Sequence, residues 1–369
     1  MAKAKKEESD TVAETQAEME AKFSDENNDK KEKPKVTIKK KTTFSLDDYK
    51  TRMQSNSVSF KKQTWIKMSE AFQELTGLPG LPEGHLAMVT GKSDTGKTTM
   101  LIEAAIYAQQ QGILPVFIIT EKKWSWDRIV ETGFDKEGCL YRDDIDTIEE
   151  GCDFMQQVLR DQAEGRLPHD LVFLWDSIGA TPSKAEFKQS ETDLEAMMKA
   201  VESGKEIKES KGGGMMVTAR ILRERITRNL SHKISATRKE SYPYNATFLI
   251  VNHAYQAPPA FPGGVTTLSP YGGDAIYLAA TLVFRMGGVM SNSSKVKATK
   301  DGIEVSFAIK SSFVVLKNHI SEASGSGKIV CTPHGFIKDD KKAIDTYKDT
   351  YKKDWMLEYD NHWDKVSLD

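Results

Sequence analysis

Residues 89–99 constrain the fold of this chain more than any other stretch. They read Val-Thr-Gly-Lys-Ser-Asp-Thr-Gly-Lys-Thr-Thr and follow a short apolar run at residues 86–89. Residues 100–108 then carry apolar side chains at helical spacing. The order of these segments predicts a β-strand, a glycine-rich loop and an α-helix.

The glycine spacing in this stretch has a mechanical reason. In the pattern G-x-x-x-x-G-K-T the backbone turns tightly, so that successive N–H groups point at phosphate oxygens at a helix N-terminus. Lys97 is expected to reach the β- and γ-phosphates of ATP, and Thr98 to place its hydroxyl on Mg²⁺. A surface loop that binds nothing is the alternative, and the strand and helix on either side favour the P-loop. The predicted nucleotide-binding residues of the loop are Gly91, Ser93, Asp94, Thr95, Gly96, Lys97, Thr98 and Thr99.

Three further apolar runs end in polar side chains. Ligands bind at the carboxyl ends of parallel strands in open α/β sheets, so these side chains are expected to meet the loop there. For each run alone, a strand that simply ends in a polar turn is the alternative. The polar residues concerned are Glu121, Asp176, Ser177 and His253.

Each of these polar groups suits one part of phosphate chemistry. Glu121 is expected to orient and deprotonate an attacking water. Asp176 ends a Walker B-like strand and is expected to hold the Mg²⁺ shell, with Ser177 bridging to the catalytic water or to that shell. His253 is expected to sense the γ-phosphate, although a lone histidine is more often structural.

Length, charge and cysteine content limit the number of domains and the classes of protein that the chain can belong to. The 369 residues permit one large core or two smaller ones, and the net charge of −2 leaves DNA contacts to local patches. The three cysteines have no C-x-x-C spacing, which argues against a zinc site or a disulfide scaffold. The chain also has no apolar run of membrane-spanning length and a charged N-terminus, so we expect a cytoplasmic protein without membrane contact.

The N-terminal region differs in composition from the rest. Residues 1–43 are charged and almost free of large apolar side chains, which predicts a disordered tail. The tail is either simply solvated or touches DNA or a neighbouring subunit through its basic part, residues 30–41. Residues 44–68 contain a short helix signal and a β-like patch. We interpret them as an N-terminal oligomerisation segment, with packing on their own domain as the alternative.

Two stretches are predicted to be DNA-binding loops. The first, residues 181–215, contains a glycine triplet and leads to an arginine-rich helix at residues 216–237; the second is residues 255–273. Glycine amides, hydroxyls and one aromatic ring suit a segment that orders against a polynucleotide and stacks on its bases. Flexible loops and a solvated helix face are the alternatives. The predicted DNA-binding residues are Gly212, Gly213, Gly214, Arg220, Arg223, Phe261, Gly263, Gly264, Thr266 and Thr267.

The late part of the chain continues the strand pattern. Residues 281–285, 304–318 and 328–336 alternate like strands, with a polar loop at residues 291–302, and a small helical lid is expected from residue 341. The predicted fold is therefore α/β, with a mostly parallel central sheet flanked by helices. The core is assigned to residues 69–325 and a small C-terminal extension to residues 326–369.

Four motifs give the chain a family resemblance. They are Gly-Leu-Pro-Gly-Leu-Pro-Glu-Gly at residues 77–84, Asp-Ser-Ile-Gly-Ala-Thr-Pro at 176–182, Val-Asn-His at 251–253 and Gly-Gly-Asp-Ala at 272–275. From about residue 66 to residue 318 the chain resembles RecA-type recombinases, and more narrowly their phage UvsX-like members.

The resemblance implies a DNA-stimulated ATPase that uses ATP and Mg²⁺. Such a protein forms helical filaments on single-stranded DNA, pairs it with homologous double-stranded DNA and promotes strand exchange in recombination and repair. The resemblance makes Glu121 the catalytic base and His253 the sensor that links the γ-phosphate to the second DNA loop. It places those loops at residues 186–215 and 256–272. Lys317 would reach the ATP of the adjacent subunit, so that nucleotide lies between protomers.

The chain departs from the family at two positions. The second cation of the Lys317 motif is His319, and the adenine-stacking tyrosine aligns with Arg128, so that Arg128 or Trp126 would stack instead. Loader and single-strand-binding proteins are the implied partners, and the cytoplasm of a phage-infected bacterium the implied location. A RecA-fold hexameric helicase and a regulatory filament without strand exchange are the alternatives.

Overall fold

The computed structural model describes residues 45–54, 58–203, 214–257, 264, 267–287, 293–300 and 303–351. The chain divides into two compact units, residues 1–57 and residues 58–369. In the first unit, α2 (Leu46–Gln54) buries none of its residues. It begins at Ser45, whose hydroxyl accepts a hydrogen bond from the Asp48 amide at 3.2 Å, as expected of a capped helix. The tail predicted over residues 1–43 lies outside the described residues.

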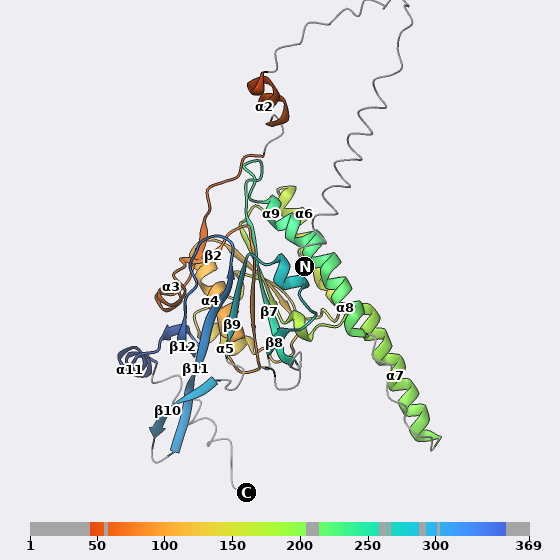
Figure 1. Ribbon diagram of the computed structural model, residues 1–369. Helices are drawn as coiled ribbons and strands as arrows, with labels where there is room; N and C mark the ends of the chain where they lie inside the picture. The colour runs from red at the N-terminus through yellow and green to blue at the C-terminus, as the bar shows by residue number, and fades with distance from the viewer. Residues whose placement is uncertain are drawn as a thin grey trace, which may run out of the picture. The chain divides into compact units, whose positions relative to one another are not determined.

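One mixed sheet organises the second unit (Figure 1). Its described strands are β3 (Leu86–Gly91), β4 (Leu114–Ile119), β5 (Leu140–Arg142), β6 (Leu171–Asp176), β7 (Ala246–Ala257), β8 (Thr267–Pro270), β9 (Leu282–Met286), β10 (Ser293–Lys300), β11 (Ile303–Asn318), β12 (Ser326–Thr332) and β13 (Gly335–Lys338). Among these the order is β13-β12-β11-β9-β3-β7-β6-β4-β5, with β10 on β11 and β8 on β7. The path from β9 to β5 is parallel throughout, and the other pairs are antiparallel. The predicted α/β class with a parallel centre is confirmed.

Helices cover both faces of this sheet, because buried side chains alternate along the strands. Phe117 and Leu174 pack with α3 (Glu70–Thr76) and α4 (Lys97–Gln110) on one face. The neighbouring Phe173 packs on the other face, with α6 (Ile148–Ala163) and the helical residues 214–236. Figure 1 shows the central strands between these two helical layers. A separate pair of short strands, β1 (Trp65–Lys67) and β2 (Gly80–Pro82), lies beside α3 in the sequence.

The arginine-rich helix predicted over residues 216–237 is present. It consists of α8 (Gly214–Leu222), π-helical turns η2 (Arg223–Leu230) and α9 (Ser231–Ala236). Its buried face repeats every four residues and packs on the sheet; these residues are Leu222, Ile226, Leu230 and Ile234. Arg220 and Arg223 lie on the exposed face.

The loop interpretation was wrong in three segments. Most of the first predicted loop, residues 186–215, is the helix α7 (Lys184–Glu202), which begins where Ser183 Oγ accepts from the Glu186 amide at 3.2 Å. The second predicted loop begins within the end of β7 and contains β8, and these two stretches pair antiparallel as a hairpin. The predicted polar loop at residues 291–302 contains β10, paired along β11. Both hairpins are held by hydrogen bonds between backbone groups, which every residue type carries. These hairpins therefore leave no apolar periodicity in the sequence.

The C-terminal part joins the main sheet. The predicted boundary near residue 325 falls between β11 and β12, which pair with Val314 opposite Ser326. A helix, α11 (Lys341–Thr350), stands where a helical lid was expected. Within the described residues, no helix is both long and apolar enough to cross a bilayer.

Candidate active site

The carboxyl ends of β3, β6 and β4 lie level with His253 of β7, which continues to Ala257, so the strand end predicted at His253 was wrong by four residues. Gly91 at the end of β3 pairs with His253 on β7, and Asp176 at the end of β6 pairs with Ile119 on β4. Glu121 follows β4 by two residues. The four predicted positions are therefore brought together, because the parallel register carries these residues to the same level of the sheet.

The glycine-rich loop turns from β3 into α4 with little free space. Gly96 has φ 94° and caps α4, which begins at Lys97. A Cβ on Gly91 would lie 2.1 Å from the carbonyl oxygen of Met286, and one on Gly96 would lie 2.3 Å from Cys331 Sγ. Only glycine fits at both positions, so β9 and β12 hold the loop close. The first amides of α4 lack partners within the helix and make this end attractive to anions.

Lys97 is a buried cation at this helix end. Its Nζ donates to the carbonyl oxygen of Lys92 at 2.6 Å, and Thr95 Oγ1 donates to the same oxygen at 2.9 Å. Burial lowers the pKa of Lys97, while the carboxylates of Asp176 and Glu121 raise it in part. The lysine charge thus faces the loop interior and two acids.

Asp176 is a buried carboxylate bonded through one oxygen. Thr98 Oγ1 donates to Asp176 Oδ2 at 2.8 Å, and Trp124 Nε1 donates to the same oxygen at 3.1 Å. Within the described part of the chain, Asp176 Oδ1 has no hydrogen-bond partner. Burial raises the pKa of Asp176, and the bond from Thr98 opposes this rise. The peptide bond from Asp176 to Ser177 is cis.

Glu121 joins three strands through its carboxylate. Its Oε1 accepts a hydrogen bond from Ser177 Oγ at 3.0 Å and is also bonded to His253 Nε2. Chiefly through the bond to His253, the pKa of Glu121 falls to about 2. Its side chain is 17% exposed, so one side of this carboxylate is open to solvent.

These residues fit ATP with Mg²⁺. The close packing at Gly91 and Gly96 fixes the loop against β9 and β12, and the buried Lys97 supplies a positive charge at the start of α4. The described residues contain no group of three or more His, Cys, Asp or Glu that could hold a metal by itself. A hydroxyl and one carboxylate are what Mg²⁺ takes from a protein when phosphates and water complete its shell. Thr98 and Asp176 would supply them.

The structure does not connect two further predicted ATP contacts with these residues. Lys317 on β11 donates to the carbonyl oxygens of Tyr277 and Leu278 at 2.8 and 3.2 Å, which ties β11 to α10 (Ala275–Ala279). Arg128 lies on α5 (Trp126–Glu131), and its side chain is outside the described part. Their roles toward ATP stay predictions.

Trp126, the other candidate for stacking on adenine, packs inward. Its ring lies 5.9 Å from that of Phe117, 6.4 Å from Phe134 and 4.8 Å from Tyr141. Sequence reasoning missed its neighbour Trp124, which bonds to Asp176. The available signal was an aromatic residue three positions after Glu121.

The DNA-binding predictions fall partly outside the structure. Gly212, Gly213, Phe261, Gly263 and Thr266 are not among the described residues, while Gly214 begins α8 and Thr267 begins β8. The backbone nevertheless connects the site to the second segment.

That connection runs through β7. Asn252 Nδ2 donates to the carbonyl oxygen of Tyr271 at 3.0 Å, and the Tyr271 amide donates to the carbonyl oxygen of His253 at 2.8 Å. Gly272 then lies against α8, where a Cβ would come within 2.3 Å of Leu222 Cδ1. The histidine bonded to Glu121 is thus joined by two steps to the helix that carries the arginines.

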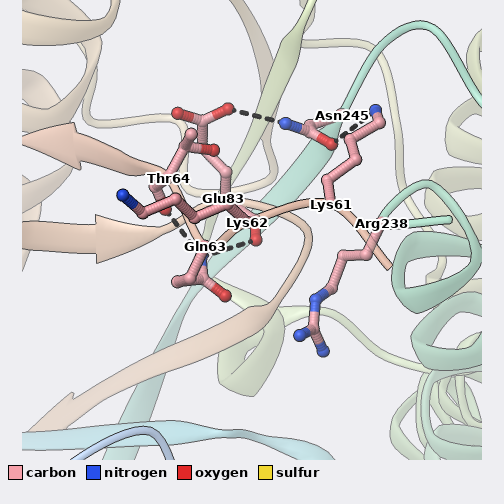
Figure 2. Close-up of a pocket in the computed structure, with 7 residues that line it drawn as sticks. All are labelled: Lys61, Lys62, Gln63, Thr64, Glu83, Arg238 and Asn245. Carbon is pink, nitrogen blue, oxygen red and sulfur yellow. Dashed lines mark hydrogen bonds between the residues drawn. The ribbon is translucent and has the colours of Figure 1, made fainter. Parts of the chain in front are cut away.

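Figure 2 shows a surface pocket away from these residues, lined by Lys61, Lys62, Gln63, Thr64, Glu83, Arg238 and Asn245. Lys61 Nζ donates to Asn245 Oδ1 at 3.0 Å, and Asn245 Nδ2 donates to Glu83 Oε2 at 2.9 Å. Glu83 and Asn245 precede β3 and β7, so the pocket lies at the amino ends of these strands. These two bonds join Lys61 and Glu83 to Asn245, and none of the predicted site residues lines the pocket.

Comparisons with known proteins find similarity to RecA proteins over part of the chain. No family model matches it. Protein RecA of Arthrobacter sp. (strain FB24) is 29% identical over 120 residues, which are 32% of this chain and 32% of the relative. Protein RecA of Kineococcus radiotolerans is 30% identical over 112 residues, 30% of each chain. Protein RecA of Paenarthrobacter aurescens (strain TC1) is 30% identical over 120 residues, 32% of this chain and 33% of the relative. The chain therefore spans about a third of the length of these relatives, and the similarity supports the RecA-type recombinase family.

Proposed function

We propose that this protein is an ATP-dependent homologous-recombination protein of the phage UvsX-like type. It forms helical filaments on single-stranded DNA, pairs that strand with homologous duplex and promotes strand exchange. The observation that carries the proposal is the bonding of Glu121 to both Ser177 and His253, beside the Thr98–Asp176 pair. These groups stand at the mouth of a glycine-lined helix end, where ATP would bind.

Each residue of the site has its own role in the proposed ATP hydrolysis. The loop amides and Lys97 would bind the phosphates, and Thr98 and Asp176 would hold Mg²⁺, whose charge would offset the negative charge of the phosphates. Glu121 orients a water molecule and accepts its proton at a carboxylate oxygen.

His253 controls how basic the Glu121 carboxylate is. Because the bond from His253 is the largest cause of the low pKa of Glu121, loss of that bond makes Glu121 more basic. His253 is also tied through Tyr271 to the β7–β8 hairpin, beside the segment proposed to bind DNA. A DNA-induced shift of the hairpin would therefore raise the rate of hydrolysis, and this is how DNA would stimulate the ATPase.

The proposed assembly places ATP between protomers. Lys317 would reach the nucleotide of the neighbouring copy after leaving the carbonyl oxygens of α10. The exposed Arg220 and Arg223 would contact the DNA backbone, together with the glycine-rich parts of both segments. Loader and single-strand-binding proteins would act as partners in a phage-infected bacterial cytoplasm.

Electron microscopy with a non-hydrolysable ATP analogue and single-stranded DNA tests the proposal. Open helical filaments are expected, whereas closed rings would point to a hexameric helicase. Filaments that bind DNA but give no product in a strand-exchange assay would indicate a regulatory filament instead.

A further inference from the structure

Trp124 makes a polar contact with the candidate active site. Its indole Nε1 donates to Asp176 Oδ2 at 3.1 Å, the same oxygen that accepts from Thr98 at 2.8 Å. Asp176 is buried, and a buried carboxylate takes its orientation from the few hydrogen bonds that it makes. Among the described residues, these two donors are the side chains that fix it.

An aromatic cluster holds the Trp124 ring in turn. The ring packs edge-on against Phe117 of β4, with centroids 5.2 Å apart at 70°. It also lies 5.8 Å from the ring of Trp126, which contacts Phe134. One end of the indole is therefore anchored by core packing while its N–H reaches the acid. The contacts limit its rotation, so the N–H position is set before any ligand binds.

The two carboxylate oxygens of Asp176 differ in their hydrogen bonds. Both donors bind Oδ2, whereas Oδ1 has no hydrogen-bond partner among the described residues. Thr98 is also the residue whose hydroxyl is proposed to hold Mg²⁺. If the hydroxyl turns toward the metal, the indole N–H is the donor that remains to keep Asp176 in place.

We infer that Trp124 is a positioning residue for Asp176, fixing Oδ2 so that the carboxylate presents Oδ1 to the metal shell. The inference rests on the proposed function, because it requires that Asp176 acts toward Mg²⁺ with ATP. Residues that orient a metal ligand from behind typically change metal affinity or activity by about 10- to 100-fold when they are removed. Trp124 thus governs how much Mg²⁺ the site needs.

Trp124→Phe is the variant that isolates the hydrogen bond, since it keeps an aromatic ring in the cluster and removes the N–H donor. Trp65→Phe is the matched control. Trp65 is likewise half-buried against the same hydrophobic core, and no hydrogen bond from its ring to Asp176 is present in the described structure. Trp124→His keeps a ring N–H donor and tests whether the bond rather than ring size matters.

The experiment measures binding of a fluorescent ATP analogue by full-length protein while Mg²⁺ is titrated, and separately without Mg²⁺. In Trp124→Phe, half-maximal binding is expected to need about tenfold more Mg²⁺ than in wild type or Trp65→Phe. Affinity without Mg²⁺ should be unchanged, and Trp124→His should lie closer to wild type.

The inference is overturned if Trp124→Phe follows Trp65→Phe, or if Trp124→His shifts as far as Trp124→Phe. A wild-type protein that binds the analogue tightly but without any Mg²⁺ dependence would also overturn it. A wild-type protein that does not bind the analogue at all would instead remove the proposed function, and the inference with it.

Discussion

Thr98 and Asp176 lie 78 positions apart in the chain, and Thr98 Oγ1 donates to Asp176 Oδ2 at 2.8 Å. The bond joins the first turn of α4 to the end of β6. These elements meet because β7 alone separates β3 from β6 in the sheet. The pair places a hydroxyl and an acid beside a helix N-terminus, which is the setting in which a Mg²⁺–phosphate complex is held.

Lys97→Ala should abolish ATP hydrolysis. The buried ammonium is the positive charge that faces the loop interior, and removal of one such group from a site of this kind lowers turnover by about 100-fold or more. Lys62→Ala is the control, because Lys62 is exposed and lines the pocket at the other end of the strands. A phosphate-release assay should show loss only in Lys97→Ala, and equal turnover of both variants would contradict the assignment.

Glu121→Gln should separate nucleotide binding from hydrolysis. The amide cannot accept the proton of water, so turnover should fall by about 100- to 10,000-fold while the affinity for the ATP analogue changes little. A variant that hydrolyses ATP at the wild-type rate would show that Glu121 is not the base.

Glu121 should also make the protein less stable to unfolding at acidic pH. The pKa of Glu121 in the folded protein is lowered from 4.5 to about 2, so its contribution is present above pH 4.5 and is lost as the pH falls toward 2. Urea unfolding of wild type at pH 5 and pH 3 should show this loss. Glu121→Gln should lack that component, and an identical loss in both proteins would contradict it.

Glu103 should produce the opposite pH dependence. It is fully buried on α4, where it accepts from Ser69 Oγ at 2.8 Å and from the Phe336 amide. Burial raises its pKa from 4.5 to about 7, so the folded protein binds an extra proton between these values and stability falls as the pH rises through them. The fall should amount to up to about 3 kcal/mol in the free energy of unfolding.

Glu103→Gln should remove this dependence. The exposed Glu240→Gln serves as the control and should keep the wild-type profile between pH 4.5 and pH 7. Chemical denaturation across this range measures the difference, and a pH profile of Glu103→Gln that overlays wild type would rule out Glu103 as its source.

Two glycines with similar backbone angles should respond differently to alanine. Gly96 has φ 94° and Gly133 has φ 89°, but a Cβ would meet Cys331 Sγ at 2.3 Å at the first position and nothing within 4 Å at the second. Gly133→Ala should cost about 1–2 kcal/mol from backbone strain alone. Gly96→Ala should cost about 1–3 kcal/mol more and also weaken binding of the ATP analogue. Equal effects in thermal unfolding and binding would show that the loop is not held by this close contact.

The strand ends of the site were predictable from sequence for a simple reason. A buried parallel strand reads as a continuous apolar run, so the polar residue that ends it, such as Glu121 or Asp176, is visible without any structure. The glycine pattern and the arginine-rich helix were visible in the same way.

Other features depend on contacts that no local pattern encodes. The helix α7 exposes Leu194 and Met198, so it lacks the buried stripe that marks a helix on a core. The β7–β8 and β10–β11 hairpins are held by backbone pairing, which is largely independent of side-chain type. The bond between Trp124 and Asp176 depends on how one ring is rotated within an aromatic cluster, which spacing cannot show.

The rate of ATP hydrolysis with and without single-stranded DNA tests the central claim most directly. The claim is that the cluster of Lys97, Glu121, Asp176 and His253 hydrolyses ATP under the control of segments that bind a polynucleotide. Turnover by the full-length protein should rise severalfold when saturating single-stranded DNA is added, and this rise should shrink in an Arg220→Ala/Arg223→Ala double variant. Hydrolysis that is the same with and without DNA would contradict the account.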